Sequence, residues 1–548
     1  MPAKQAYTTN AANDQWLNDT YYGRQTKEDR FDSLPRFGTA GIRASVGIGS
    51  SHFNGSVLQK IVQAVADELF KEAGSPARGA VIAYDSRPGS ASLAGEAALT
   101  LAANGITAYL FDSLCPTPQL SFAVPYLRAA AGLMITASHN SWKDNGCKIY
   151  DEYGCQITPQ QAHRLYLAMT SGSDRLIELP EKKSAPAKGS LRPIDKKVTT
   201  AYYLSALDSL LNMPLTQAKG SSFSIVYTPF YGAGRKAVSE VLTKAGFNSL
   251  FVVPEQEYAD GCFATLPRPN PEYHETFKLA LKYARQSNAD LVLATDPDAD
   301  RLGLCCKDGD TYNILSGNQV GLLLAYYLFS QKAAQKMLPA DGILIRSMVS
   351  TPLADKLAAH FGVSTSVTAV GSCHIGAGIM RIKQSGQGSF LFGFEESLGY
   401  IMPGHCLEKD AVAAAALAAE AALYYRETKD HTLVQVLANI YRQFGYFLHY
   451  QETIALPGYR ARERAADFME SLSSLACREC TVEMLADPPF PLILRFIFGE
   501  GNYVIVRPSG TEPKIKLYYG AQASTKARAS SNLAYLRRSF KRLLEENK

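Results

Sequence analysis

The chain lacks any apolar run long enough to cross a membrane. Its most apolar stretches, AVAAAALAAEAALYY and VGLLLAYYLF, fall short of the ~18 residues that a spanning helix needs. The segment MPAKQAYTTNAANDQW also lacks the apolar region of a secretory signal peptide. Cysteine is scarce as well, because 10 cysteines in 548 residues do not make the disulfide framework of a secreted scaffold. We therefore expect a cytoplasmic protein without a membrane partner.

The sequence also lacks an excess of charge of one sign. Its 56 basic and 51 acidic residues are interspersed and leave a net charge of only +5. This balance provides neither the basic arm of a nucleic-acid-binding protein nor a charged membrane-binding face, so we expect any anionic partner to be a small molecule. With 46% hydrophobic residues the chain can bury large cores. At roughly 150 residues per domain, its length indicates three or four domains.

Short strand-like segments alternate with helical ones along most of the chain, which is typical of α/β domains. One series runs GAVIAYDS, SLAGEAALTLAANG, ITAYLFDS, LSFAVPYLRAA and AGLMITAS, and similar series run from FSIVYTPF to ADLVLAT and from GILIRSMVS to SFLFGFEES. The remainder differs, with strand-like LILRFIFG and YVIVRPSG between two helical segments. We predict three similar α/β domains and a smaller C-terminal α+β domain, at residues 1–198, 199–315, 316–438 and 439–548.

The segment LVLATDPDADRLG places Asp296, Asp298 and Asp300 on alternate positions after a buried strand. Carboxylates with this spacing converge on one point and suit a hard cation such as Mg²⁺. A calcium-binding EF-hand is excluded, because that loop needs Gly and Glu where this chain has Arg301 and Lys307. A phosphotransferase of the haloacid-dehalogenase type fits less well, because Asp300 stands where that enzyme class has Thr or Val.

A second segment, AGLMITASHNSWKDNGCKIY, presents a hydroxyl group at the end of a buried strand. We expect this strand to end at Ile135, which leaves Ser138 and His139 in a loop, with Lys148 further along. Ser138 is therefore a candidate phosphoryl acceptor. A serine hydrolase is disfavoured, because the glycines of a G-x-S-x-G elbow are absent.

Three further loops suit anions or sugars. RPSGTEPKIK combines cationic and hydroxyl side chains with freed backbone donors, a set that can bind a phosphate, and its candidates are Arg507, Ser509, Gly510, Thr511 and Lys514. RFGTAGIRAS supplies Arg43 on a glycine-rich turn. GFEESLGY places Glu395 and Ser397 at a strand end, where carboxylate and hydroxyl groups suit sugar hydroxyls.

Taken in order, FGTAGIR, TASHN, DPDADR, GFEES and RPSGTEP resemble the α-D-phosphohexomutase superfamily. The resemblance runs from about residue 36 to 520 and points to the bacterial-type phosphoglucomutase/phosphomannomutase branch, to which phosphopentomutase-like members also belong. It implies four domains around a central cleft, the first three sharing an α/β core. It also implies an intramolecular phosphotransferase that interconverts 1-phospho and 6-phospho hexoses of glucose or mannose through a bisphosphorylated intermediate.

The resemblance also implies roles for single residues. Ser138 is carried as phosphoserine, and Mg²⁺ is held by an oxygen of that phosphoserine and by Asp296, Asp298 and Asp300. The residues expected near the reacting phosphoryl group are Arg43, His139 and Lys148, with Lys148 a candidate general acid/base. Arg301 is expected in a structural or substrate-contacting role, Glu395 and Ser397 at the sugar hydroxyls, and the distal phosphate on Arg507, Ser509, Gly510, Thr511 and Lys514. We expect the protein to bind a phosphosugar substrate and to use glucose 1,6-bisphosphate as an activator. We expect it to be a monomer or a weak dimer.

Two positions depart from the pattern of the superfamily. Ser141 replaces a common proline, which removes no chemistry. Cys373, in AVGSCHIGAG, stands where relatives of this branch usually have a substrate-contacting lysine, and His374 is a candidate to substitute for it in part. An active mutase and a weakly active regulatory paralogue that binds phosphosugar both remain open, and a phosphopentomutase or a glucose-1,6-bisphosphate synthase would present nearly the same motifs.

Overall fold

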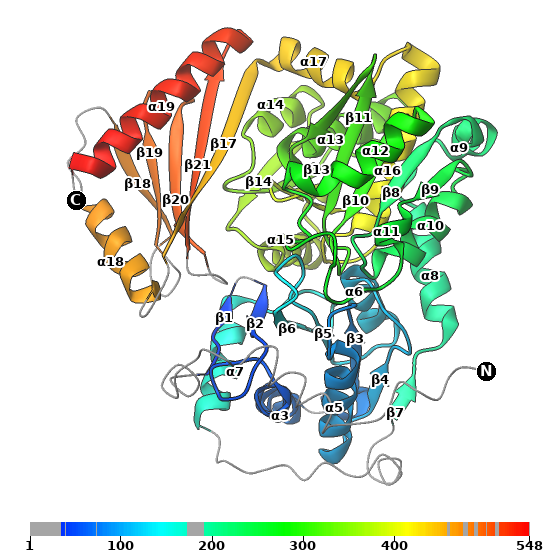
Figure 1. The fold of residues 1–548 in the computed structure, drawn as a ribbon, viewed down its shortest axis with the longest axis vertical. Coiled ribbons are helices and arrows are strands. Elements are labelled where there is room, and N and C mark those ends of the chain that lie inside the picture. The colour runs from blue at the N-terminus through cyan, green and yellow to red at the C-terminus, as the bar shows by residue number, and fades with distance from the viewer. Residues whose placement is uncertain are drawn as a thin grey trace. The chain divides into compact units, whose positions relative to one another are not determined.

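The computed structural model describes residues 34–38, 40–72, 74–171, 191–456, 461–474, 480–486, 492–499, 501–509 and 514–546. The described chain divides into two compact units. The first comprises the described residues up to Gly303 together with Ile401–Ala416, and the second comprises Leu304–Tyr400 and the described residues from Leu417 onward. Figure 1 labels many of the helices and strands of both units.

The first unit contains a seven-stranded sheet of order β1-β2-β6-β5-β3-β4-β7. Within it β5, β3, β4 and β7 are parallel, whereas β1, β2 and β6 pair in antiparallel fashion at one edge. The strands are β1 (Phe37–Gly38), β2 (Gly41–Ser45), β3 (Ala80–Tyr84), β4 (Ala108–Leu110), β5 (Ala131–Ile135), β6 (Asp144–Tyr150) and β7 (Leu191–Pro193).

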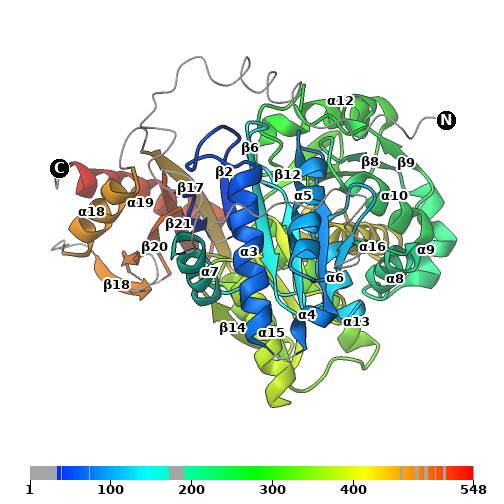
Figure 2. The same ribbon diagram turned by 90° about the horizontal axis from the view of Figure 1, so that it is seen from below.

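Helices cover both faces of this sheet. On one face α3, α5 and α7 pack around a core that includes Leu58 and Ile61 of α3, and Figure 2 shows α3 and α5 side by side. On the other face α6 contributes Leu120 and Val124. Because both faces are covered, every residue of β5 is buried and the polar serine loop starts only after Ile135. The helices are α3 (Gly55–Lys71), α4 (Ser75–Arg78), α5 (Ser90–Ala103), α6 (Thr117–Tyr126) and α7 (Pro159–Ser171).

A second α/β domain follows in the first unit. Its parallel strands lie in the order β10-β8-β9, and all residues of β10 are buried. The acidic loop starts directly after Thr295, the last residue of β10. The elements are α8 (Lys196–Leu207), α9 (Met213–Lys219), β8 (Ile225–Thr228), α10 (Gly234–Lys244), β9 (Leu250–Val252), α11 (Pro254–Glu257), α12 (Lys278–Ser287) and β10 (Leu291–Thr295).

An antiparallel hairpin of β11 (Leu302–Asp308) and β12 (Thr311–Leu315) leads into a third α/β domain. Its sheet has the order β14-β13-β15-β16, with β13 parallel to both β14 and β15. The elements are α13 (Gly317–Ala334), β13 (Gly342–Ser347), α14 (Leu353–His360), β14 (Ser364–Thr368), α15 (Ser372–Ser385), β15 (Ser389–Glu395), β16 (Gly399–Ile401), α16 (Ala411–Lys429) and α17 (Leu433–Phe444).

The C-terminal part of the second unit is an antiparallel sheet of order β17-β21-β20-β19-β18. Two helices, α18 and α19, pack on one face of this sheet around a core that includes Phe496 and Phe540 (Figure 1). The elements are β17 (Tyr446–Ala455), α18 (Ala461–Ser473), β18 (Thr481–Ala486), β19 (Ile493–Ile497), β20 (Tyr503–Pro508), β21 (Lys514–Ala523) and α19 (Lys526–Glu546).

These elements confirm the predicted fold class of three α/β domains and a C-terminal α+β domain. In the part of the chain that the structure describes, no helix combines the length and apolar character that crossing a membrane requires. Of the cysteines within the described ranges, eight form no disulfide, whereas Cys480 is disulfide-bonded.

Candidate functional site

The serine loop and the acidic loop of the first unit meet at the ends of two buried strands. β5 ends at Ile135 and β10 at Thr295, and the loops that follow bring the Ser138 hydroxyl to 2.7 Å from Oδ2 of Asp296. Ser138 is buried, and its Oγ also lies 3.2 Å from Nδ1 of His139. Its φ of 53° is in the left-handed region, which is unfavourable for a residue with a Cβ. The structure therefore holds this hydroxyl in a defined place.

The acidic loop is shaped by hydrogen bonds from its own backbone and from α6. Oδ1 of Asp296 accepts hydrogen bonds from the backbone N–H groups of Asp300 and Arg301, each at 3.1 Å. Thr117 donates twice to Asp298, from its hydroxyl to Oδ2 at 2.6 Å and from its backbone N–H to the carbonyl oxygen at 2.8 Å. These bonds fix the carboxylates of Asp296 and Asp298 and the backbone of the loop that carries Asp300.

Two lysines neutralise part of the acidic charge. Nζ of Lys148 lies 2.6 Å from Oδ2 of Asp298 and 2.7 Å from Oδ2 of Asp300, and Nζ of Lys409 lies 3.3 Å from the latter atom. Burial lowers the pKa of Lys148, but the two carboxylates outweigh burial and the pKa ends above its ordinary value. Lys148 is therefore an ammonium ion at neutral pH.

The three carboxyl groups differ in their protonation equilibria. Burial, together with the charges of Asp298 and Asp300, raises the pKa of Asp296 well above its ordinary value. Burial also opposes ionisation of Asp298 and Asp300, but the neighbouring Lys148 outweighs it and lowers both pKa values. Asp296 is thus the carboxyl group that most needs a further cation to remain ionised.

The residues of the acidic loop fit a divalent metal ion. Asp296, Asp298 and Asp300 each offer a carboxylate oxygen within 4.8 Å of the others. Oδ1 of Asp298 and Oδ1 of Asp300 are buried and accept no hydrogen bond, and Nε of Arg301 lies 3.9 Å from the latter, too far to donate one. Buried carboxylate oxygens without partners are unfavourable, and oxygen donors of this kind suit Mg²⁺.

A second group of residues in the first unit, His405, Cys406 and Asp410, also has metal-ligating atoms close together. Here the atoms already have partners. Oδ2 of Asp410 accepts a hydrogen bond from Tyr202 at 2.9 Å and lies 2.6 Å from Nε2 of His405, while Oδ1 accepts the backbone N–H groups of Val412 and Ala413 in the first turn of α16. Asp410 thus caps a helix, which is a structural role.

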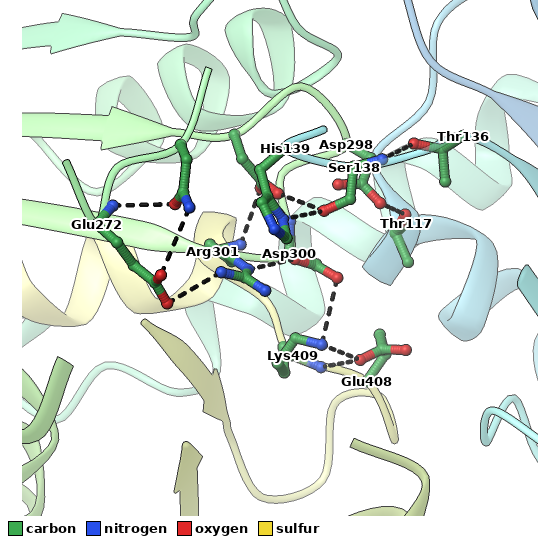
Figure 3. A network of polar contacts seen from close by, with 12 residues as sticks. Thr117, Thr136, Ser138, His139, Glu272, Asp298, Asp300, Arg301, Glu408 and Lys409 are labelled. Atoms are coloured by element: carbon green, nitrogen blue, oxygen red, sulfur yellow. Dashed lines mark hydrogen bonds and ion pairs between the residues drawn. The ribbon is translucent and has the colours of Figure 1, made fainter. Parts of the chain in front are cut away.

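The other two predicted residues of the first unit lie at the edges of this site. Arg43 lies on β2 and not on a glycine-rich turn, so that expectation was wrong. It donates from Nη1 to Oδ1 of Asn140 at 3.2 Å, which ties it to the serine loop, and its buried Nε has no hydrogen-bond partner. Arg301 follows the last aspartate and pairs with Glu272 at 3.1 Å (Figure 3). The first unit therefore brings together all eight residues predicted there, namely Arg43, Ser138, His139, Lys148, Asp296, Asp298, Asp300 and Arg301.

The second unit carries the residues predicted to bind the sugar. Glu395 is the last residue of β15, and its Oε1 accepts the backbone N–H of Gly371 at 3.0 Å, while Ser397 lies in the turn that follows. Cys373 and His374 are in the first turn of α15. Cys373 is 2% exposed, whereas His374 is partly exposed, and burial lowers the pKa of its imidazole despite the opposing charge of Glu395. His374 is therefore neutral at pH 7.

The predicted phosphate loop lies between β20 and β21 in the same unit. Arg507 is near the end of β20, and the backbone N–H of Ser509 donates to the carbonyl oxygen of Lys514, the first residue of β21, at 2.8 Å. Gly510 and Thr511 lie outside the described residues. The positive charge of Arg507 contributes to lowering the pKa of His374.

Sequence reasoning missed two residues of the site. Lys409 and Thr117 contact Asp300 and Asp298 across 109 and 181 positions of the chain. Lys409 stands in LEKDAV, which is typical of a solvated helix start, and Thr117 stands in PTPQL, an ordinary helix N-terminus. Nothing in the residues next to Lys409 or Thr117 signals a contact with the acidic loop, so the local sequence could not identify them.

Comparison with known proteins gives a match in each part of the chain. Residues 35–175, 201–309 and 316–444 match family models described as phosphoglucomutase/phosphomannomutase, alpha/beta/alpha domains I, II and III. Residues 461–531 match the C-terminal domain of the same family. A phosphoglucomutase of Staphylococcus saprophyticus is 30% identical over 534 residues, which cover 92% of this chain and 94% of that protein.

Solved structures show the same fold. A phosphoglucomutase/phosphomannomutase family protein from Burkholderia thailandensis superposes with a TM-score of 0.69 at 19% identity, covering 93% of this chain and 97% of that one. An N-acetylphosphoglucosamine mutase from Aspergillus fumigatus, solved in complex with GlcNAc-6P and magnesium, superposes with a TM-score of 0.51 at 12% identity and covers 98% of this chain and 100% of that one.

Proposed function

The chain belongs to the phosphoglucomutase/phosphomannomutase family of intramolecular phosphotransferases, and on that premise we propose that it interconverts glucose 1-phosphate and glucose 6-phosphate through a phosphoserine at Ser138. Its phosphohexomutase activity follows from the family. The preference for glucose is the proposal, and it is supported by the phosphoglucomutases to which the chain is similar over nearly its whole length.

One observation carries the assignment of Ser138. Its hydroxyl is buried, lies 2.7 Å from Asp296 and is held by a loop at the end of a strand. The acidic loop beside it, with Lys148 and Lys409, supplies both the negative ligands for a cation and the positive charges that favour a phosphate.

The residues proposed to hold Mg²⁺ are Asp296, Asp298 and Asp300, with the oxygen of Ser138. Support comes from the two buried oxygens without hydrogen-bond partners and from the magnesium of the related Aspergillus enzyme. A bound dication would neutralise the charge that develops on the transferring phosphoryl group.

The chain's own residues then divide the work of transfer. The bond between phosphorus and Oγ of Ser138 breaks as a bond forms to the free hydroxyl oxygen of the sugar monophosphate, and the hydroxyl proton leaves to a base. The product is a bisphosphate, which reorients and returns its other phosphoryl group to Ser138 by the reverse steps. Lys148, an ammonium ion in the resting site, gives its proton to Oγ of Ser138 as the bond to phosphorus breaks, and the resulting neutral amine is the base that takes the proton of the sugar hydroxyl; the second transfer runs these proton movements in reverse. Arg43 and His139 orient the phosphoryl oxygens.

Residues of the second unit are proposed to bind the rest of the substrate. Glu395 and Ser397 bind sugar hydroxyls, and Arg507, Ser509 and Lys514, with Gly510 and Thr511, bind the distal phosphate. Neutral His374 is a hydrogen-bond partner for a sugar hydroxyl instead of a charge partner for phosphate. We also propose that glucose 1,6-bisphosphate restores the phosphoserine, and that the enzyme works in the cytoplasm as a monomer or weak dimer.

The test is a comparison of substrates with the wild type beside Ser138→Ala. Glucose 1-phosphate, mannose 1-phosphate and ribose 1-phosphate are each incubated with Mg²⁺ and a trace of the matching bisphosphate. We expect the highest kcat/KM for glucose 1-phosphate, and at least a roughly 1,000-fold loss in Ser138→Ala, on the order of what removal of a covalent nucleophile costs. A higher value for ribose 1-phosphate would make the chain a phosphopentomutase, and turnover that survives in Ser138→Ala would end the assignment of the serine.

A further inference from the structure

A single buried arginine of the first unit binds the serine loop through its backbone. Nη2 of Arg87 donates to the carbonyl oxygens of Ser138 and Asn140, at 2.5 and 2.7 Å, and Nη1 donates to those of Ser141 and Asp144, at 2.6 and 2.8 Å. One planar guanidinium therefore fixes carbonyl groups along the whole loop. Such a set of donors in one plane is available only to arginine.

The same arginine is tied back to the N–H group of Ser138. Nε of Arg87 donates to Oδ2 of Asp85 at 3.1 Å, and the hydroxyl of Thr136 donates to the same oxygen at 2.6 Å. The backbone N–H of Ser138 donates to that hydroxyl oxygen at 2.7 Å, a bond drawn in Figure 3. The N–H group of Ser138 is thus linked through Thr136 to Asp85, and its carbonyl group is bound by Arg87. Because Asp85 and Arg87 pair with each other, these four residues form a closed ring of hydrogen bonds.

The ion pair is itself held from several sides. Oδ1 of Asp85 accepts the hydroxyl of Ser90 at 2.8 Å and the backbone N–H of Arg87 at 3.0 Å. The guanidinium of Arg87 lies 5.2 Å from the ring centroid of Phe263, which belongs to the second α/β domain of the same unit. The side chains of Asp85 and Arg87 are both fully buried. Burying such a charged pair costs desolvation energy. A role in fixing a specific geometry would account for its presence here.

The geometry that it fixes is unfavourable without support. The left-handed region that Ser138 occupies is unfavourable for a residue with a Cβ, so the loop would relax if its peptide groups were free. Relaxation would turn the hydroxyl of Ser138 away from Asp296. We propose that Asp85, Thr136 and Arg87 are positioning residues, which set the conformation of Ser138 for phosphoryl transfer without touching the substrate. This inference rests on the proposed role of Ser138 as phosphoryl carrier.

A matched pair of variants at Thr136 tests the ring of hydrogen bonds. Thr136→Val keeps the shape of the side chain but removes the acceptor for Ser138 and the donor to Asp85, whereas Thr136→Ser keeps the hydroxyl and loses only a methyl group. We expect kcat to fall about 100-fold in Thr136→Val with KM within about twofold of the wild type, because misplacement of a reacting group by about 1 Å has effects of this size. Thr136→Ser should stay within about threefold of the turnover of the wild type.

A second comparison uses two arginines of the same domain. Arg87→Lys retains the charge opposite Asp85 but cannot bind four carbonyl groups in one plane, and we expect turnover to fall by about 100-fold or more at unchanged KM. Arg78→Lys is the control. Arg78 also binds a carboxylate, that of Glu152 at 2.7 Å, and two backbone carbonyl groups, those of Arg128 and Ala129, each at 3.1 Å. None of these contacts involves the serine loop. Hydrogen exchange of the peptide that covers residues 137–144 should be faster in Arg87→Lys and in Thr136→Val than in either control.

Different outcomes test the positioning role and the proposed function. Equal turnover in Thr136→Val and Thr136→Ser, with unchanged exchange of the serine loop, would overturn the proposal, and so would a KM effect larger than the kcat effect. If Arg87→Lys fails to fold, the comparison of Thr136→Val with Thr136→Ser, neither of which changes a charge, still tests the positioning role. Full turnover in Ser138→Ala would instead overturn the proposed function itself.

Discussion

The ammonium group of Lys148 lies 2.6 Å from Oδ2 of Asp298, and both side chains are buried. The lysine therefore serves as a resident countercharge for the acidic loop, since Asp296, Asp298 and Asp300 would repel one another without a cation. Removal of Lys148 leaves the buried Asp298 without its ion-pair partner, whereas removal of Asp298 leaves Lys148 paired with Asp300 at 2.7 Å.

Lys148→Met should abolish most of the activity and make the protein more dependent on metal. We expect turnover to fall by about 100-fold or more, because a general acid/base contributes at least that much. We also expect Mg²⁺ to raise the Tm more in this variant than in the wild type, since the carboxylates then lack their resident cation. Thermal melts with EDTA and with Mg²⁺ measure this difference. The exposed Lys143, mutated to Met, is the control and should show the wild-type shift; an equal shift in all three proteins would contradict the countercharge role.

Asp298→Asn should remove the stabilisation by Mg²⁺, because one of the two carboxylate oxygens without hydrogen-bond partners belongs to this residue. Asp410→Asn is the comparison, because Asp410 belongs to the second group of residues with metal-ligating atoms but caps α16. This variant should have a lower Tm both with and without metal. We expect its free energy of unfolding to fall by about 1 to 3 kcal/mol, because the oxygens of Asp410 accept several buried hydrogen bonds. Calorimetric titration with Mg²⁺ should show binding to Asp410→Asn and none to Asp298→Asn. Loss of binding in Asp410→Asn alone would move the metal to the other group.

Asp151→Asn should stabilise the protein at neutral pH and not in acid. Burial raises the pKa of Asp151 from 3.8 to about 6, against hydrogen bonds from the backbone N–H groups of Cys155 and Tyr153. The folded state therefore binds more protons than the unfolded state between these values, so stability is lost as the pH rises through about 6. Asparagine keeps the oxygen acceptor and has no charge to bury.

We expect Asp151→Asn to be more stable by about 1 kcal/mol near neutral pH, less than the full pKa shift implies because the carboxyl group is partly exposed. At a pH near the ordinary pKa of an aspartate, about 4, the advantage should be nearly absent. Melting curves across this range measure it, with the exposed Asp112→Asn as a control that should show no such trend. An advantage that grows toward acid pH would have the wrong sign for this explanation.

Cys373→Lys should harm the protein, although the resemblance to this branch leads one to expect a lysine here. The Cys373 side chain is 2% exposed in the first turn of α15, where an ammonium group would be buried against the positive end of the helix. We expect a loss of about 2 kcal/mol and no gain in kcat/KM. His374→Lys places the amine on the partly exposed neighbour and should fold normally. A stable and more active Cys373→Lys would show that the side chain at 373 can reach the substrate.

The sequence was sufficient for the fully apolar strands and for the loops that follow them, whereas β2 and β6 were not predicted. The ends of β5 at Ile135 and of β10 at Thr295 could be predicted, because fully apolar strands give way there to polar residues. The convergence of the three aspartates could also be predicted from their spacing. These features depend on residues close together in the chain.

The partners of those loops could not be predicted. Arg87 contacts the serine loop across 51 positions, and it stands in YDSRPGS, which reads as an ordinary turn. The spacing of Cys373 and His374 likewise gives no sign that one is buried and the other partly exposed. Such facts depend on packing between elements that are distant in sequence, which local pattern does not encode.

The most direct test of the account is the location of the phosphoryl group. The wild type and Ser138→Ala are incubated with glucose 1,6-bisphosphate and Mg²⁺, and the phosphorylated peptide is identified by mass spectrometry. The account predicts one phosphate, on Ser138, in the wild type and none in the variant. Phosphate on another residue of the wild type, with Ser138 unmodified, would contradict it.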